Sequence, residues 1–137
     1  MTFDIITIFP RIFDSYFGES ILKRAQARKL ISIQSHDLRK FTTDKHHKVD
    51  DSPFGGGAGM VFKIEPIYNA VQTVLHDLGV VVDKKKQTER SNKRSGRTPR
   101  TPRTRIILFS TRGKKFDANV ARRLAKYDRL ILICGRY

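Results

Sequence analysis

The chain has 137 residues, which suits one domain with a modest core, and no apolar run approaches the roughly 20 residues of a membrane span. Its 28 lysines and arginines against 13 acidic residues give a net charge of +15, which favours a polyanionic partner, most often nucleic acid, over a membrane surface or solubility alone. The start lacks the features of a secretory signal and the single cysteine, Cys134, excludes an internal disulfide, so we expect a cytoplasmic protein without a membrane partner.

The first part of the chain alternates short apolar runs with helical patterns. Runs of β-branched residues predict strands, and apolar residues three and four positions apart predict helices. The predicted elements are a strand over Phe3–Phe9 that Pro10 ends, a short helix over Arg11–Phe17, a helix that Ser20 caps and that runs to about Lys29, a strand over Ile31–Gln34, and a helix over Ile67–Leu78 with Pro66 in its first turn and Gly79 at its end.

A polar, glycine-rich stretch from Phe41 to Met60 interrupts this pattern. It reads FTTDKHHKVDDSPFGGGAGM and shows no helical or strand periodicity. Ordering such a segment costs conformational entropy that burial hardly offsets. A long irregular loop in a compact domain is more often a binding or catalytic segment than a connector.

From Asp83 to Thr104 the composition changes to basic and polar residues, with no large apolar side chain. Between Asp83 and Arg105 there are ten basic residues against two acidic ones, and the other half of the net charge is spread over the rest of the chain. We interpret residues 83–104 as a disordered basic insertion. It is either a solvated linker or a segment that attracts phosphates through charge alone.

Regular secondary structure is expected again after the basic insertion. The predicted elements are a strand over Arg105–Phe109, a turn over Ser110–Gly113, a helix over Ala118–Lys126 capped by Asp117, and a strand over Leu130–Cys134. Alternating strands and helices predict an α/β fold with a mainly parallel sheet flanked by helices. Ligands of such sheets bind beyond the carboxyl ends of strands, which points to the turns after Phe109 and Cys134.

Several motifs within the polar stretch have more than one interpretation. The run Gly55–Met60 lacks the lysine and serine or threonine of a P-loop, and indicates either a flexible hinge or a close approach of the backbone to a large ligand. His46 and His47 have no metal-site spacing, so we expect no metal. They are either surface histidines or groups that hydrogen-bond to bases or transfer protons. Asp50 and Asp51 are suited to accept hydrogen bonds from the N1–H and amino group of guanine.

Taken in order, DIITIFP, LISIQ, DKHHKVDDSPFGGGAGM and LILICGRY resemble the bacterial tRNA (guanine-N1)-methyltransferases, knotted enzymes of the SPOUT class. The resemblance covers nearly the whole chain outside the insertion. It implies a SPOUT-type α/β knot fold, a homodimer with each active site at the dimer interface, and transfer of a methyl group from S-adenosyl-L-methionine to N1 of guanine 37 in tRNA.

The same resemblance implies roles for individual residues. His46 and Asp50 match positions that contact the guanine region of the tRNA, and Gly59 lies in the loop that frames it. The positions that match the donor-binding turns are Leu108, Phe109, Ser110, Thr111, Gly135 and Tyr137, with Gly135 and Tyr137 lining the adenosine pocket. Thr111 replaces the usual proline of the family.

The chain ends at Tyr137, where the family pattern continues with Glu-Gly, the rest of the knot and a C-terminal tRNA-binding domain. We therefore expect an incomplete N-terminal methyltransferase domain over residues 1–137, in which the general-base aspartate and its arginine partner are missing. Asp50 is the one nearby carboxylate that we can suggest as a substitute base. The chain alone should be inactive. The alternative is a basic RNA-binding module without methyl-donor chemistry.

Overall fold

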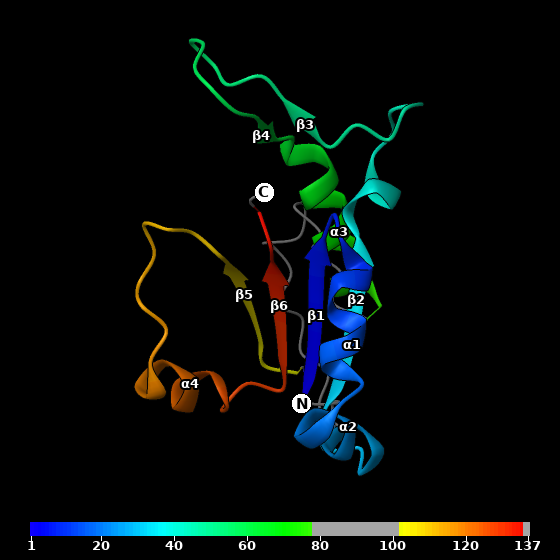
Figure 1. Ribbon diagram of the computed structural model, residues 1–137, viewed down its shortest axis with the longest axis vertical. Coiled ribbons are helices and arrows are strands. Elements are labelled where there is room, and N and C mark those ends of the chain that lie inside the picture. Colours follow the sequence, from blue (N-terminus) through cyan, green and yellow to red (C-terminus); the bar gives the residue numbers. More distant parts are fainter. Residues whose placement is uncertain (78–101, 136–137) are drawn as a thin grey trace, which may run out of the picture.

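The computed structural model describes residues 1–77 and 102–135, which form a layered α/β structure (Figure 1). In chain order the elements are β1 (Thr2–Thr7), a 3₁₀ turn η1 (Pro10–Phe13), α1 (Asp14–Phe17), α2 (Ser20–Ala27), β2 (Ser32–Asp37), a second 3₁₀ turn η2 (Leu38–Phe41), β3 (Asp50–Asp51), β4 (Val61–Phe62), α3 (Ile64–His76), β5 (Thr104–Leu108), α4 (Ala118–Leu124) and β6 (Arg129–Ile133). Within the described ranges, no helix is long and apolar enough to cross a membrane.

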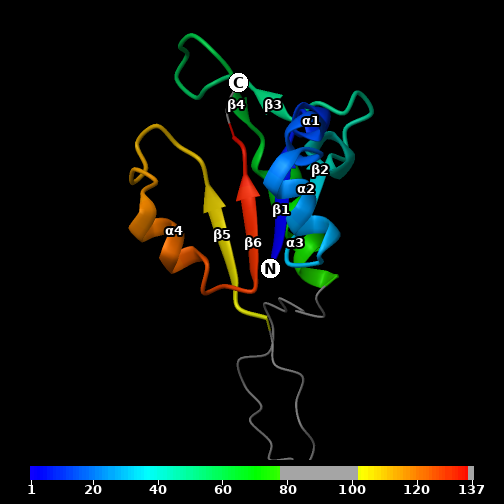
Figure 2. The ribbon, with the colours of Figure 1, turned by 60° about the horizontal axis from the view of Figure 1, so that its bottom comes forward.

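Four strands form one parallel sheet in the order β2-β1-β6-β5. The connections through α1 and α2 and through α4 lie on one face, and α3 covers the other (Figures 1 and 2). This arrangement is what right-handed crossovers require, because both β1-to-β2 and β5-to-β6 step across the sheet in the same direction. The predicted α/β class with a mainly parallel sheet is confirmed.

The core lies between α3 and the central strands. Ile6 of β1 and Ile131 of β6 are fully buried, and Ala70 and Val74 of α3 pack against them at helical spacing. Each fully buried large aliphatic side chain contributes about 1.5–3 kcal/mol relative to an exposed one. This contact holds α3 and the two central strands as one rigid unit.

A buried ion cluster ties three strands together on the α3 face. The carboxylate of Asp4 on β1 is fully buried and accepts hydrogen bonds from Nε and Nη2 of Arg129 and from Nε2 of His36, the last at 2.9 Å. Burial by itself would raise the pKa of Asp4. The hydrogen bonds and charges of His36 and Arg129 outweigh that effect, so the pKa lies below its ordinary value.

Several predicted boundaries differ from the structure. Ser20 is the first residue of α2 and not its cap: Glu19 occupies the cap position, without a side-chain hydrogen bond, and Ser20 has a left-handed φ of 49°. β2 continues to Asp37, because His36 is held by the buried Asp4 despite its polarity. α3 begins at Ile64, which still leaves Pro66 within the first turn, and β5 begins at Thr104.

Two further outcomes concern the polar stretch and the insertion. Asp50–Asp51 and Val61–Phe62 pair as a short antiparallel ladder, which the absence of strand periodicity did not predict. The predicted cap Asp117 is confirmed, since its carboxylate accepts a hydrogen bond from the backbone N–H of Val120 at 2.7 Å. Gly79 and residues 83–101 of the predicted insertion lie outside the described residues.

Candidate functional site

The candidate site lies at the edge of the sheet where β1, β6 and β5 end. The strand pattern continues one residue past β5, because the N–H of Phe109 donates to the carbonyl of Ile133 at 3.1 Å. The chain then turns at Ser110, whose carbonyl accepts from Gly113 and whose Oγ accepts from the N–H of Arg112, both at 3.2 Å. This turn fixes its backbone through its own hydrogen bonds and leaves Thr111 exposed.

The second turn, after β6, approaches the first one closely. The N–H of Cys134 donates to the carbonyl of Ile6 at 2.9 Å, which anchors Gly135 at the end of the sheet. A methyl group on Gly135 would lie 3.2 Å from Cδ1 of Leu108 and 3.9 Å from Cδ2 of Phe62. Gly135 therefore forms the meeting point of the two turns and the β3–β4 hairpin.

An apolar groove of about 680 Å³ extends from this edge between α4 and the sheet. Its walls include Leu132 of β6 and Val120 and Leu124 of α4. Phe109 and Ser110 lie at the end of the groove that borders the first turn. The groove therefore places apolar surface beside the backbone of the predicted donor turns, a combination typical of small-molecule sites.

Cys134 lies between the buried strand and this edge. Its side chain is half-buried, and burial raises the pKa of the thiol. A thiol with a raised pKa remains protonated at neutral pH and is a poor nucleophile. This favours a structural role for Cys134 over a catalytic one.

The segment that carries the two histidines is a compact turn beside η2. The carboxylate of Asp44 accepts hydrogen bonds from the N–H groups of Lys48 at 3.0 Å and of His46 at 3.1 Å, and these bonds, that of Lys48 foremost, lower the pKa of Asp44. His47 has a left-handed φ of 53°, and its Nδ1 lies 3.2 Å from the carbonyl oxygen of Arg39. The side chain of His46 is exposed. His47 is thus part of the turn's structure, whereas His46 is free to face a ligand.

The hairpin places the paired aspartates beside the donor turns. Asp50 of β3 pairs with Phe62 of β4, whose Cδ2 would lie 3.9 Å from a methyl group on Gly135, so the hairpin pairing brings Asp50 to the same end of the sheet. The loop between these strands projects from the sheet (Figure 1), with Phe54 fully exposed. Gly59 adopts a φ of 98°, a backbone conformation that residues other than glycine rarely adopt.

The structure separates the other predicted substrate residue from the donor turns. His46 follows β2 and η2 at one side of the sheet, and Ser110 follows β5 at the other. β2 and β5 are the two outer strands of the sheet, so the segments that follow them leave it at opposite sides. Asp50 and Gly135 are brought together within one chain, whereas His46 and Ser110 are not. Tyr137 lies outside the described residues.

Phe62 could not be selected from the sequence, because it stands in a two-residue strand with no pattern around it. Its role follows only from the contact with Gly135. The carboxylates and histidines of the site do not form a metal-binding set: in the described part of the chain, no group of three or more His, Cys, Asp or Glu gathers.

Comparison with known proteins gives one consistent family. The family model described as tRNA (Guanine-1)-methyltransferase TrmD matches residues 1–137. The crystal structure of tRNA (m1G37) methyltransferase from Aquifex aeolicus superposes with a TM-score of 0.74 and 31% sequence identity, over 99% of this chain and 51% of that one.

Curated relatives named tRNA (guanine-N(1)-)-methyltransferase are similar along the whole chain. The proteins from Dehalococcoides mccartyi strain BAV1 and Thermomicrobium roseum are each 44% identical over 137 residues, and that from Geobacter sulfurreducens is 41% identical. The match covers 46%, 43% and 46% of these proteins, respectively. The chain thus spans a little under half the length of the curated relatives it matches.

Proposed function

Because the chain belongs to the tRNA (guanine-1)-methyltransferase family, we propose that it serves in the methylation of N1 of guanine 37 in tRNA with S-adenosyl-L-methionine as the methyl donor. The observation that carries this proposal is the match of the family model to all 137 residues. Support from the geometry comes from Gly135, where both predicted donor turns and the hairpin of the predicted guanine loop meet.

The residues at the carboxyl edge fit a donor that combines an adenosine with a charged amino-acid end. The backbone at Gly135 has no side chain, so a flat ring can approach it, and the exposed side chains of Leu108 and Phe109 supply apolar surface. Ser110 and Thr111 contribute hydroxyl and backbone groups that can hydrogen-bond the polar parts. When bound, S-adenosyl-L-methionine supplies an electrophilic methyl group; Tyr137 completes the adenosine pocket in this proposal.

The substrate half of the proposed site must bind guanine and accept its N1 proton. His46 and Asp50 are proposed to contact the guanine region, and Gly59 to shape the loop that frames it. Guanine N1 holds its proton at neutral pH, so a general base has to remove it as the new N–C bond forms. Asp50 reaches this end of the sheet through the pairing of β3 with β4, and it takes that role only where no further aspartate is supplied.

A homodimer accounts for the separation of the two predicted halves. His46 and Ser110 lie at opposite sides of the same sheet, so one chain does not place both against one guanine. We propose that His46 of one protomer serves the donor turns of its partner, and that these turns belong to the trefoil knot of the SPOUT class. Exposed apolar side chains at this side of the sheet, Leu108, Phe109 and Phe116, are available for such contacts.

A second candidate function, an RNA-binding module without donor chemistry, rests on the net charge of +15. Both functions are compatible with a cytoplasmic protein that meets tRNA there. Only the methyltransferase function requires a binding site for the methyl donor. Isothermal titration with S-adenosyl-L-homocysteine tests this difference: we expect saturable binding with one site per chain, and the absence of any heat of binding would overturn the methyltransferase proposal in favour of the RNA-binding module.

A further inference from the structure

The positive charge of the described residues is concentrated in one structural unit. Residues 102–135, which form β5, α4 and β6, contain nine basic and two acidic residues, a net charge of +7. Residues 1–77 contain ten basic and nine acidic residues, a net charge of +1. The charge is therefore not spread evenly over the folded part of the chain, as its sequence suggested, but lies on the side of β5 and α4.

Most of these cations have no acidic neighbour. Arg103 pairs with Asp128, and Arg129 pairs with the buried Asp4. The carboxylate of Asp117 caps α4 through the N–H of Val120. Within residues 1–77 and 102–135, no ion pair neutralises any of the seven remaining cations of the unit, which are Arg105, Arg112, Lys114, Lys115, Arg122, Arg123 and Lys126. We call these seven residues the α4 basic surface.

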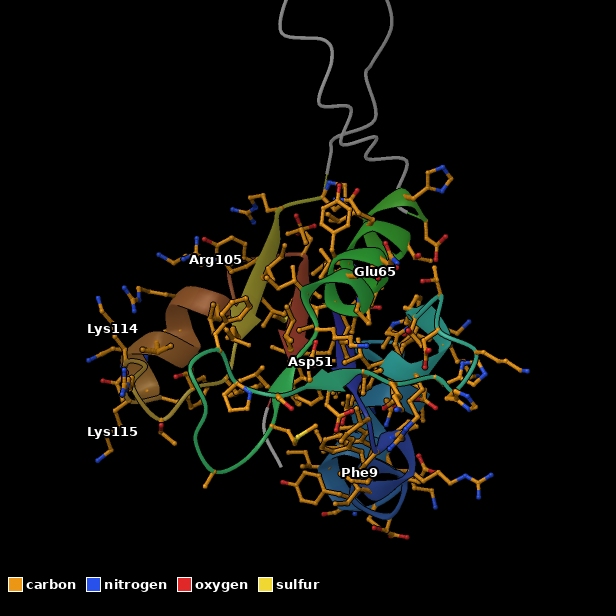
Figure 3. All side chains as sticks on the ribbon, turned by 90° about the horizontal axis from the view of Figure 1, so that it is seen from above. Phe9, Asp51, Glu65, Arg105, Lys114 and Lys115 are labelled. Carbon is orange, nitrogen blue, oxygen red and sulfur yellow. The ribbon has the colours of Figure 1, made fainter. Side chains whose placement is uncertain are left out.

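All seven residues of the α4 basic surface are exposed. Figure 3 shows Arg105, Lys114 and Lys115 on the side of β5 and α4, with both lysine side chains directed away from the ribbon. Val120 and Leu124 of α4 line the apolar groove, and so do three of the seven cations, Arg105, Lys114 and Arg123. The other four cations lie outside the groove lining. The surface is thus an uncompensated cationic face with a fixed backbone beneath it.

The hairpin between β3 and β4 lies on the same side of the molecule. In Figure 1 it rises above β5 and the β5–α4 connection, and seen from above in Figure 3 its loop lies over the same side of the sheet as Lys114 and Lys115. A nucleotide held at the hairpin would therefore leave its flanking phosphates over the β5–α4 side. Arginine and lysine attract phosphates without regard to base sequence and fix the position of the backbone.

We propose that the α4 basic surface binds the phosphate backbone of the tRNA whose guanine reaches the hairpin, and so positions the nucleotide for the reaction. This inference rests on the proposed function for the identity of the RNA. It adds a binding surface to the two halves of the candidate site. The charge asymmetry also gives the complex a preferred orientation, because the other described part of the chain is nearly neutral.

The test compares two triple variants of the full chain with the same loss of charge. The first is Arg122→Gln, Arg123→Gln and Lys126→Gln on the α4 basic surface. The matched control is Lys23→Gln, Arg24→Gln and Arg28→Gln on and just after α2, where all three side chains are also exposed. Fluorescence anisotropy with labelled tRNA gives the dissociation constant at a series of salt concentrations, and circular dichroism checks that each variant is folded.

We expect the α4 variant to bind tRNA on the order of tenfold more weakly and to show a salt slope reduced by roughly two to three units, one for each lost phosphate contact. The α2 control should change affinity less than about threefold, the residual effect of net charge. Equal losses of tRNA affinity in the two variants, or an unchanged salt slope in the α4 variant, would refute the proposal that the α4 basic surface binds tRNA. So would a lack of tRNA binding by the wild-type chain.

Two further arms separate this inference from its premise. Polyglutamate at equal charge concentration should compete poorly with tRNA; equal competition would mean that the surface serves an acidic protein and not RNA. Titration of S-adenosyl-L-homocysteine measures the donor site independently. Failure of donor binding, with α4-dependent tRNA binding retained, would overturn the methyltransferase proposal and leave the RNA surface standing.

Discussion

Gly135 lies so close to Leu108 that a methyl group on its Cα would come within 3.2 Å of the leucine Cδ1. The two residues belong to different turns, one after β6 and one at the end of β5, and Phe62 of the hairpin approaches from the other side. A methyl group at this point would be tightly packed against the leucine, whose exposed side chain can shift. This contact joins the predicted donor site to the predicted substrate loop.

Replacement of Gly135 by alanine should weaken donor binding more than it weakens the fold. Gly135 does not have a left-handed φ, and the atom that the new methyl would meet belongs to the exposed side chain of Leu108, which can move by a few tenths of an ångström. We expect a loss of less than about 1 kcal/mol in the free energy of unfolding. The affinity for S-adenosyl-L-homocysteine, measured by titration calorimetry, should fall by about tenfold or more, because misplacement in a close-packed pocket costs 1–3 kcal/mol.

Gly18→Ala is the control for this experiment. Its methyl group would lie 3.1 Å from the backbone carbonyl oxygen of Asp14, which is less able to move, and far from the candidate site. This variant should lose more stability than Gly135→Ala and retain its affinity for S-adenosyl-L-homocysteine. An unaltered affinity of Gly135→Ala for S-adenosyl-L-homocysteine would show that Gly135 is not part of the donor site.

The buried cluster around Asp4 should make the fold sensitive to acid. Asp4→Asn removes the negative charge that Arg129 and His36 face, and breaking a buried ion pair in this way should lower the free energy of unfolding by about 3 kcal/mol at pH 7. Urea unfolding followed by circular dichroism measures this loss. Asp14→Asn, at an exposed position on α1, should change stability by less than about 0.5 kcal/mol.

The pH dependence of the Asp4 contribution has a definite sign. The pKa of Asp4 is lower in the folded chain than its ordinary value of 3.8, so the folded state holds the proton less tightly than the unfolded one. The stabilisation is therefore complete above about pH 4 and is lost as the pH falls through the folded-state pKa. The difference in the free energy of unfolding between wild type and Asp4→Asn should shrink in that acidic range. A constant difference from pH 7 to pH 2 would mean that the ionised carboxylate of Asp4 does not stabilise the fold.

The two adjacent histidines should respond differently to substitution. His46→Ala removes an exposed side chain, so it should leave stability within about 0.5 kcal/mol and weaken tRNA binding by roughly threefold to tenfold, the worth of one hydrogen bond. His47→Ala removes a side chain that is hydrogen-bonded to Arg39 and should cost about 1 kcal/mol of stability without changing the affinity of the folded chain. The reverse pattern in anisotropy and unfolding experiments would assign the tRNA contact to His47.

The chain of 137 residues should bind the donor without methylating tRNA. The resemblance matches none of these 137 residues to the general base of the family, and Asp50, on the hairpin, is the carboxylate proposed as a substitute. Incubation with S-adenosyl-L-methionine and tRNA, followed by mass spectrometry of the nucleosides, should detect no N1-methylguanine above a control without protein. Product formation that is lost in Asp50→Asn would instead identify Asp50 as a working base.

The strands with dense β-branched residues were accessible to prediction from sequence. The runs around Ile5, Ile107 and Ile131 predicted β1, β5 and β6 to within a few residues, because strands of a parallel sheet are rich in β-branched and aliphatic residues. β2 was found in part only. Its second half contains His36 and Asp37, and the polar His36 is held in the strand by the carboxylate of Asp4, far away in sequence.

The pairing of distant segments was not accessible in the same way. The strand order β2-β1-β6-β5 depends on contacts between residues more than a hundred positions apart, such as Asp4 and Arg129. The β3–β4 ladder is two residues long on each side, too short for any periodicity. The predicted site residues Ser110 and Gly135 lie at one edge because parallel strands end together, but the contact of Gly135 with Phe62 leaves no trace in the sequence.

The central claim is that the turns at Ser110 and Gly135 form a binding site for the methyl donor. Titration of the isotopically labelled chain with S-adenosyl-L-homocysteine, followed by amide NMR, tests it at the level of single residues. We predict saturable shifts at Ser110, Thr111 and Gly135, a smaller shift at Phe62, and none on α2. Shifts that are absent from both turns, or that appear only on distant parts of the chain, would contradict the claim.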